Sequence, residues 1–298
     1  MKQYSLALVA AWLATAAFAQ HEHHDAAPAA KVPSAESRRP PAAREWTQRP
    51  LLLPARNPRG ERAAATLRPQ GIAATHVTVF APEGPAERLK VDYPVDASGA
   101  NIASATPKIG NYHWVVAREE SPDAVKVAST TWYFGNPGDS PKDLLKTAKH
   151  ELEIVPDPLP REHGRYRESE KWRFLVRFNG QPLPSQPVTL ETEFGTRTSF
   201  VTDAAGFATV LFPRDFKPAD SKAGDAEGHG RRTGKFVLST EKESDGRRFL
   251  TAFNLTYGQD GDRNRSIEWG AAFGLIGMLA ATPLLRRRNG TQGDAKNA

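Results

Sequence analysis

Apolar and polar residues alternate along most of the chain between positions 71 and 258. An apolar, aromatic or β-branched side chain occupies every second position in the stretches 89–93, 112–116, 172–178, 188–194 and 249–257. This alternation is typical of a β-strand with one buried face. The pairs Asn179-Gly180 and Asp245-Gly246, which favour tight turns, lie between such stretches. The pattern therefore predicts an all-β body.

The stretches fall into two groups. Asn136-Pro137-Gly138-Asp139 interrupts the alternation, and Ser140 to Lys149 then carries a capping pattern with proline in the first turn, which predicts a short helix. Short strands at regular spacing, separated by turns, are typical of β-sandwiches. We therefore predict two β-rich units, at residues 71–150 and 151–258, both immunoglobulin-like β-sandwiches.

Residues 26–70 show no apolar periodicity and are rich in Ala, Pro and Arg. A segment of this composition buries too little apolar surface to fold alone. We therefore predict that 20–70 is a histidine-rich start followed by a disordered tether. Leu51-Leu52-Leu53 is a short apolar island within it, and its length does not decide whether it docks elsewhere.

The N-terminus has the pattern of a signal peptide. Lys2 supplies a positive charge, residues 6–18 are apolar, and Ala17-Phe18-Ala19 is a small-x-small cleavage site. We predict removal of residues 1–19, which leaves Gln20 first. The alternative is an uncleaved signal anchor, but the apolar run is short for a bilayer span.

The C-terminus predicts a transmembrane helix at 267–288. Residues 269–285 carry no charge and would contact the lipid bilayer, and three arginines follow at 286–288. By the positive-inside rule the tail at 289–298 is cytoplasmic and the body lies in the periplasm, on the outer side of the inner membrane. The alternative is a C-terminal sorting signal that is cut off.

Composition narrows the chemistry. The chain has no cysteine, so it has neither disulfides nor thiolate metal ligands. The net charge of +6 comes largely from the basic excess in 31–68 and the arginines at 286–288, which suits a linker and a membrane flank. We expect no nucleic-acid partner, because that needs basic residues on a folded face. No catalytic motif occurs, so we do not expect an enzyme.

Histidines are the candidate metal ligands. His21, His23 and His24 follow the predicted cleavage site, and neutral imidazoles bind nickel, cobalt, copper and zinc. The alternative is a solvated polar tail. His76 and His113 lie in two predicted strands, each facing away from its apolar neighbours, and could meet across adjacent strands. The alternative is that each is a lone surface or core histidine.

The second unit resembles a known family. The residues that carry the resemblance are Glu151-Leu152-Glu153-Ile154-Val155-Pro156, the strand and turn at 174–183, and the hairpin at 202–208. Over residues 151–257 the sequence resembles the periplasmic, membrane-anchored family named for the NikM subunit of nickel transport complexes. The resemblance implies an exported β-sandwich protein with a transmembrane segment and a histidine near the mature N-terminus, the position that His21 holds. The long tether departs from the family pattern.

These observations together suggest a function. We predict a membrane-anchored periplasmic accessory protein in transition-metal uptake, which binds a nickel or cobalt ion or a transporter partner. Its partners would be inner-membrane metal transporter subunits. The alternative is a non-catalytic envelope spacer or protein-interaction module without metal.

Overall fold

The computed structural model describes residues 46–55, 63–106, 112–135, 141–160, 164–216, 232–260 and 267–286. The predicted signal peptide, His21, His23, His24 and the C-terminal tail lie outside these ranges. Within them no helix combines the length and apolar character that crossing a membrane requires. The described helices are η1 (Ala86–Arg88), α1 (Lys142–Lys146) and α2 (Ile267–Arg286), and α1 confirms the short helix predicted before the second unit.

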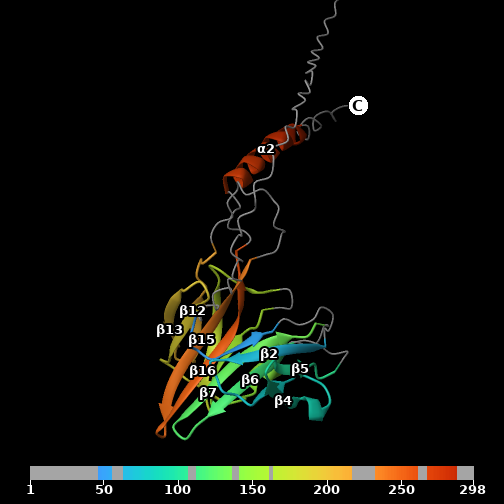
Figure 1. The fold of residues 1–298 in the computed structure, drawn as a ribbon. Coiled ribbons are helices and arrows are strands. Elements are labelled where there is room, and N and C mark those ends of the chain that lie inside the picture. The colour runs from blue at the N-terminus through green and yellow to red at the C-terminus, as the bar shows by residue number, and fades with distance from the viewer. Residues whose placement is uncertain are drawn as a thin grey trace, which may run out of the picture. The chain divides into compact units, whose positions relative to one another are not determined.

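Strands make up most of the described body, which confirms the all-β prediction (Figure 1). In chain order they are β1 (Leu51–Pro54), β2 (Ala64–Gln70), β3 (His76–Phe80), β4 (Lys90–Asp96), β5 (Gly99–Ala103), β6 (Tyr112–Glu120), β7 (Ala124–Tyr133), β8 (Leu152–Asp157), β9 (Tyr166–Arg167), β10 (Lys171–Phe178), β11 (Gln181–Pro182), β12 (Pro187–Thr192), β13 (Arg197–Val201), β14 (Phe207–Leu211), β15 (Thr233–Ser244) and β16 (Arg247–Gly258).

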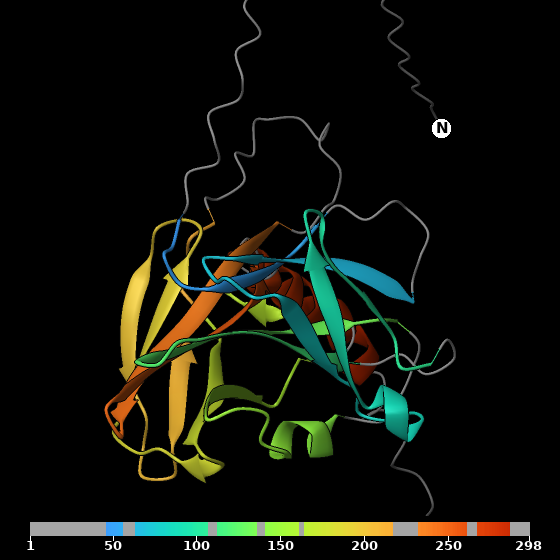
Figure 2. The same cartoon turned by 60° about the horizontal axis from the view of Figure 1, so that its bottom comes forward.

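The strands form three layers. The middle layer has the order β3-β6-β7-β16-β15-β12-β13. One outer layer consists of β8, β10, β11 and β14, and the other of β1, β2, β5 and the end of β4. Figure 2 shows β12 and β13 in yellow at one side of the body and β2 to β5 in blue to teal at the other. Each outer layer encloses an apolar core with the middle layer, so the sandwich arrangement is confirmed.

Strand β4 carries the sheet from the middle layer to the outer one. Residues 90–94 pair with β3, whereas residues 95–96 pair with β5. A strand that changes partners in this way forms a corner between two packed layers. The fold-over places β2 and β5 above β3 and β6, with Leu67 and Ile102 buried between the layers.

Strands β6 and β7 are buried on both faces. Trp114 and Val116 point into the core shared with β8 and β10, while Val115 and Ala117 point into the core under β2 and β5. This explains why β6 has consecutive apolar residues from Trp114 to Ala117, since a strand covered on both faces has no solvent side there.

The two predicted units share a sheet. Strands β7 and β16 pair in parallel, from Ala124 opposite Arg248 to Ser129 opposite Phe253. The larger core likewise mixes residues of both ranges, with Trp114 stacked on Phe253 at 5.5 Å between ring centroids. Side-chain packing and backbone pairing therefore join residues 71–150 to residues 151–258.

The prediction of disorder through residue 70 is wrong for 51–54 and 64–70, which form β1 and β2. The apolar island does dock: Leu51 packs on Val237 and Ala252 of β15 and β16. The buried Asn254 accepts a hydrogen bond from Leu52 N–H at 2.8 Å and donates one to Leu52 C=O at 2.8 Å. A run of three apolar residues is too short to show a periodicity, and its partners lie about 200 residues away in the sequence.

Candidate functional site

A hollow of about 320 Å³ lies where β6, the segment after α1 and the β10–β11 turn meet. Its lining residues are Arg118, Ala148, Lys149, His150, Glu151, Asn179 and Gly180. The lining includes titratable groups of four kinds, so the hollow is the candidate functional site on the body. Three groups of contacts determine its properties: a guanidinium–carboxylate pair, a buried cluster under α1, and His150.

Arg118 and Glu151 form the wall of the hollow. Both terminal nitrogens of Arg118 donate to the Glu151 carboxylate, at 2.6 and 2.8 Å, in the two-pronged geometry of the strongest ion pairs. Hydrogen bonding to Glu151 raises the pKa of Arg118, and the same contact lowers the pKa of Glu151 to about 2. The pair ties β6 to the start of β8 and leaves this wall without net charge.

Four residues at the hollow form what we call the junction cluster: Lys149 and His150, which line it, and Glu153 and Arg177. Glu153 and Arg177 are buried and ion-paired through Arg177 Nε. The other Arg177 nitrogens donate to the carbonyls of Lys146 and Thr147, at 2.6 and 2.7 Å. These carbonyls belong to the C-terminal end of α1, which lacks intrahelical donors. Arg177 thus fastens α1 to β8 and β10.

Lys149 completes the same cap. Its ammonium donates to the carbonyls of Leu144 and Thr147, at 2.6 and 2.7 Å, and lies 5.1 Å from the centroid of the buried Trp114 ring. Burial lowers the pKa of Lys149 to about 8. The Lys149 N–H donates to Glu153 at 2.9 Å, so the chain passes directly from the helix cap into the buried carboxylate.

His150 is the exceptional residue of the site. Its side chain is 2% exposed, and neither ring nitrogen has a hydrogen-bond partner among the described residues. Nε2 lies 3.8 Å from Glu153 Oε1, beyond hydrogen-bonding distance. Burial lowers the pKa of His150 to about 4, although Glu153 and Glu151 favour the proton, so the ring is neutral at pH 7. The cationic Arg118 and Lys149 lie near it, which disfavours a metal ion there.

The ion pairs and hydrogen bonds of this arrangement join one segment of the body to another. The lining has no hydroxyl or thiol side chain, and its Arg118 and Glu151 neutralise each other. The Glu-Leu-Glu-Ile-Val-Pro stretch, which carried the family resemblance, supplies both Glu151 and Glu153. Here Glu151 joins the outer layer to β6 of the middle layer, and Glu153 holds Arg177 within the outer layer.

His76 and His113, the two histidines predicted to lie in adjacent strands, do not meet. In the β3–β6 register Val77 pairs with Ala117 and Phe80 with Trp114, which places His76 and His113 at opposite ends of the ladder. About five residue positions, roughly 16 Å, separate them along the strands. The expectation that they could share a site is therefore wrong, because the antiparallel register moves them apart.

Each body histidine also has a local role. His76 is exposed, with Nδ1 3.2 Å from Thr75 Oγ1. His113 is buried, its Nε2 accepts the Ala105 N–H at 3.1 Å, and its ring meets Phe134 edge-on. That nitrogen is not available to a metal. Within the described ranges no three His, Asp or Glu side chains are grouped in a way that could hold a metal ion.

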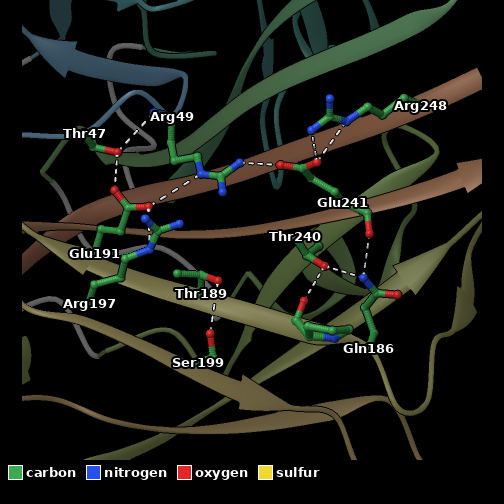
Figure 3. A network of polar contacts seen from close by, with 11 residues as sticks. Thr47, Arg49, Gln186, Thr189, Glu191, Arg197, Ser199, Thr240, Glu241 and Arg248 are labelled. Atoms are coloured by element: carbon green, nitrogen blue, oxygen red, sulfur yellow. Dashed lines mark hydrogen bonds and ion pairs between the residues drawn. The ribbon is translucent and has the colours of Figure 1, made fainter.

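A second polar feature lies on β15 and β16, on the face of the middle layer opposite the larger core. Residues 46–54, which we call the strap, cross β15 and β16 there (Figure 3). Thr47 donates to Glu191 at 2.7 Å, and Arg49 bridges Glu191 at 3.5 Å and Glu241. Arg248 also pairs with Glu241. We call these five residues the strap network. Sequence reasoning missed them because they are polar or charged residues in segments predicted to be tether or strand surface.

Comparisons with known proteins add no family. No family model matches the chain, and no curated protein matches it. Among solved structures, a chain from a 1.5-MDa bacterial ice-binding adhesin aligns with 12% identity and a TM-score of 0.23 over 71% of this chain and 65% of that one. The D0–D1 domain of intimin aligns with 16% identity and a TM-score of 0.23, over 65% and 87%.

A segment of two fibronectin type III domains from chicken tenascin aligns with 9% identity and a TM-score of 0.20, over 69% of this chain and 98% of that one. The aligned part of this chain covers less than two thirds of the adhesin chain. Likeness at these scores supports no conclusion about activity or partners.

Proposed function

We propose that the protein is a membrane-anchored periplasmic accessory subunit for transition-metal uptake, whose β-body holds an N-terminal histidine segment that captures nickel or cobalt. Its partners are inner-membrane transporter subunits, and residues 269–285 anchor it in the bilayer. The observation that carries the proposal is the cluster His21, His23 and His24 directly after a signal-peptide pattern. Three imidazoles within four residues are held close by the covalent chain itself, and this ligand type suits both metals.

The strap supports the proposal by fixing the point from which that segment leaves the body. Leu51 and Leu52 are buried, and Asn254 holds the backbone of Leu52 from both sides. About 20 residues separate His24 from Trp46, the first residue of the strap. Covalent geometry therefore limits the metal ligands to at most roughly 75 Å from the body. A histidine segment joined to the body by a linker of this length can deliver a metal to a transporter in the same membrane.

A specific observation favours a second candidate, a rigid envelope spacer without metal. The ion pairs Arg118–Glu151 and Arg177–Glu153 each join one element of the body to another. A spacer needs this kind of cross-linking between elements and needs no ligand. In this second function the histidines are a polar tail.

Calorimetry separates the two candidates. The mature full chain is titrated with Ni²⁺, Co²⁺, Cu²⁺ and Zn²⁺, beside a variant with His21, His23 and His24 replaced by Ala. A His76→Ala/His113→Ala variant is the matched control. Metal capture predicts nickel binding that the first variant loses and the control keeps. Capture should also weaken as the pH falls through about 6.5, the ordinary pKa of histidine.

The outcomes differ for each candidate. Loss of binding in the control alone would place the ligands on the body and overturn the tail site. Absence of binding for all four metals in the parent would reject metal capture and leave the spacer function.

A further inference from the structure

The body has two ends that differ in charge. Strands β15 and β16, the long orange strands of Figure 1, pair from Thr233 opposite Gly258 at one end to Ser244 opposite Arg247 at the other. We call the first the exit end, because β16 finishes there and the chain continues toward residue 267. The second is the far end. Along β15 the two ends are roughly 36 Å apart.

Contacts between segments distant in sequence define the exit end. Strand β9 pairs with the last two residues of β16. The β12–β13 turn lies beside β15, because Glu193 N–H donates to Lys235 C=O at 3.1 Å. After β14, the ring centroid of Phe216 lies 5.3 Å from that of Tyr257. The exit end therefore comprises residues 165–170, 193–197, 212–216, 232–235 and 257–260.

The exposed charged side chains of the exit end are all basic. They are Arg197, Arg214, Arg232 and Lys235. Lys235 and Arg197 keep 45% and 65% of their side chains exposed, although each lies near a glutamate. The acidic side chains there are buried or half-buried: Glu168, Glu170, Glu193, Asp215 and Asp260.

The far end has the opposite charge. It consists of the turns at 119–124, 202–206 and 241–248. Ala124 pairs with Arg248, and Gln186 contacts both Thr202 and Glu241, which brings the three turns to one end. The exposed charged side chains there are Glu120, Asp123, Asp203, Glu243, Asp245 and Arg248. A body whose two ends differ in charge is oriented by the field of a charged surface.

Phe194 protrudes from the exit end, in the β12–β13 turn. It is 48% exposed, and its ring is held in place by Phe216, whose centroid lies 5.1 Å away. Gly234 lies directly against the ring, where a Cβ atom would clash with it. The exit end thus combines a fixed, exposed aromatic ring with exposed basic side chains, the composition of surfaces that bind at a membrane interface.

The sequence keeps the exit end near the predicted membrane segment. Residues 261–268 connect Asp260, at the exit end, to Trp269, where the uncharged run begins. Fully extended, this connection spans at most roughly 30 Å. Of the two ends, the exit end is therefore the one that the chain holds beside the bilayer.

We propose that the exit end docks on the membrane surface, where Phe194 enters the headgroup region and the exposed basic side chains bind the phosphates of anionic lipids. Charge and chain length together identify lipid as the occupant. A surface of anionic lipids attracts each nearby Lys or Arg within about a Debye length, and it repels the carboxylates of the far end. Docking therefore stands β15 and β16 upright on the bilayer. The proposal rests on the membrane anchor of the proposed function and is independent of metal capture.

The absence of cysteine in the chain permits a direct test. Thr233→Cys places a single thiol at the exit end, and Ala204→Cys places one at the far end; both positions are exposed. Each full-length variant is labelled with a thiol-reactive fluorophore and reconstituted into vesicles of phosphatidylcholine and phosphatidylglycerol, after circular dichroism has confirmed an unchanged β-fold. A nitroxide on the lipid headgroup then quenches any label that lies at the membrane surface.

Quenching at position 233 several-fold stronger than at 204 is the expected result. It should fall in vesicles of phosphatidylcholine alone, and also in 1 M salt, where the Debye length is about 3 Å. Equal quenching at the two positions, in a chain that alkaline carbonate does not extract from the vesicles, would overturn docking and leave the anchor standing. A chain that carbonate does extract would reject the anchor and docking together.

Substitutions assign the effect to the exit end. Arg197→Gln, made in the Thr233→Cys chain, should lower the quenching at least about twofold, because it removes one charge from the docking surface. Arg248→Gln is the matched control at the far end: its side chain is 58% exposed and also pairs with one glutamate, and its loss should leave the quenching unchanged. Phe194→Ser should lower the quenching as well, whereas Val201→Ser, near the far end of the same hairpin, should not. Equal effects of the two arginine variants would mean that net charge alone attracts the body, and would overturn the proposal.

Discussion

The junction cluster and the strap network both fasten one segment to the sandwich with ion pairs, but they differ in burial. The side chains of Arg177 and Glu153 are 4% and 0% exposed, whereas those of Arg49 and Glu241 are 22% and 30% exposed. A buried charge that loses its partner has no water to replace it, while a surface charge does. The same chemistry therefore gives an indispensable contact in one place and a dispensable one in the other.

The strap compensates for its weak ion pairs with apolar and backbone contacts. Leu51 is 1% exposed on β15 and β16, and Asn254 makes two hydrogen bonds to Leu52. The junction cluster depends on its charged groups instead. The end of α1 and the start of β8 meet there, and Arg177 and Lys149 satisfy the backbone carbonyls at the end of α1. The comparison predicts where substitution, acid and salt will act.

The largest effect should follow from removing one buried partner. Glu153→Ala leaves the Arg177 guanidinium buried without its carboxylate, and we expect a loss of about 3–5 kcal/mol in the free energy of unfolding. Urea unfolding followed by tryptophan fluorescence measures it. Glu151→Ala is the control, because it removes the partially exposed partner of Arg118 and should cost about 1 kcal/mol or less. Similar losses for both variants would contradict the importance of burial.

A double variant sharpens the same point. Replacing the pair with apolar residues, Glu153→Leu with Arg177→Met, removes both charges and their desolvation cost. It should be more stable than Glu153→Ala. A double variant less stable than the single one would show that capping of the α1 carbonyls by Arg177, rather than charge compensation, dominates.

The second largest effect should be a loss of stability at acid pH, caused by protonation of His150 in the unfolded state. Its pKa is about 4 in the folded protein and about 6.5 in an unfolded chain, so the unfolded state takes up the proton first. Stability from this residue is fully present above pH 6.5 and is lost progressively down to pH 4. A shift of this size corresponds to about 3 kcal/mol. Unfolding free energies measured from pH 7.5 to 4.5 test this.

The control variants assign that acid effect to one side chain. His150→Gln has no proton to bind, so its stability should change much less over the same range. His76→Gln, at an exposed position, should follow the parent. A parent whose stability is unchanged between pH 7 and 5 would show that the buried ring has access to water.

The sequence predicts single strands better than their partners. Alternation over 172–178 and 249–257 corresponds to β10 and β16, because each has one face on a core and a period that local sequence records. The parallel pairing of β7 with β16 leaves no such record, since it joins strands more than 100 residues apart. For the same reason β1 and β2 were predicted as tether.

The site shows the same limit at single residues. Arg173 and Arg177 both occupy polar positions of one alternating strand, yet Arg173 is exposed and Arg177 is buried under the end of α1. Periodicity assigns a face and cannot say what covers it. One signal was available: Glu153 interrupts the apolar run of Leu152, Ile154 and Val155, and a charge in such a run requires a buried partner.

The smallest effect should come from the strap network. Arg49→Ala removes its contacts with Glu191 and Glu241, but Arg248 remains on Glu241 and Thr47 remains on Glu191. Because these carboxylates keep another partner and lie near water, we expect a loss of about 0.5–1 kcal/mol, and less at 1 M salt than at 0.05 M. Leu51→Ala is the contrast within the same segment: it empties a buried site and should cost about 2–4 kcal/mol with little dependence on salt. Unfolding of both variants at the two salt concentrations provides the comparison. If Arg49→Ala costs as much as Leu51→Ala at high salt, charge rather than apolar burial holds the strap to the sheet, and the two polar clusters differ less than their exposure suggests.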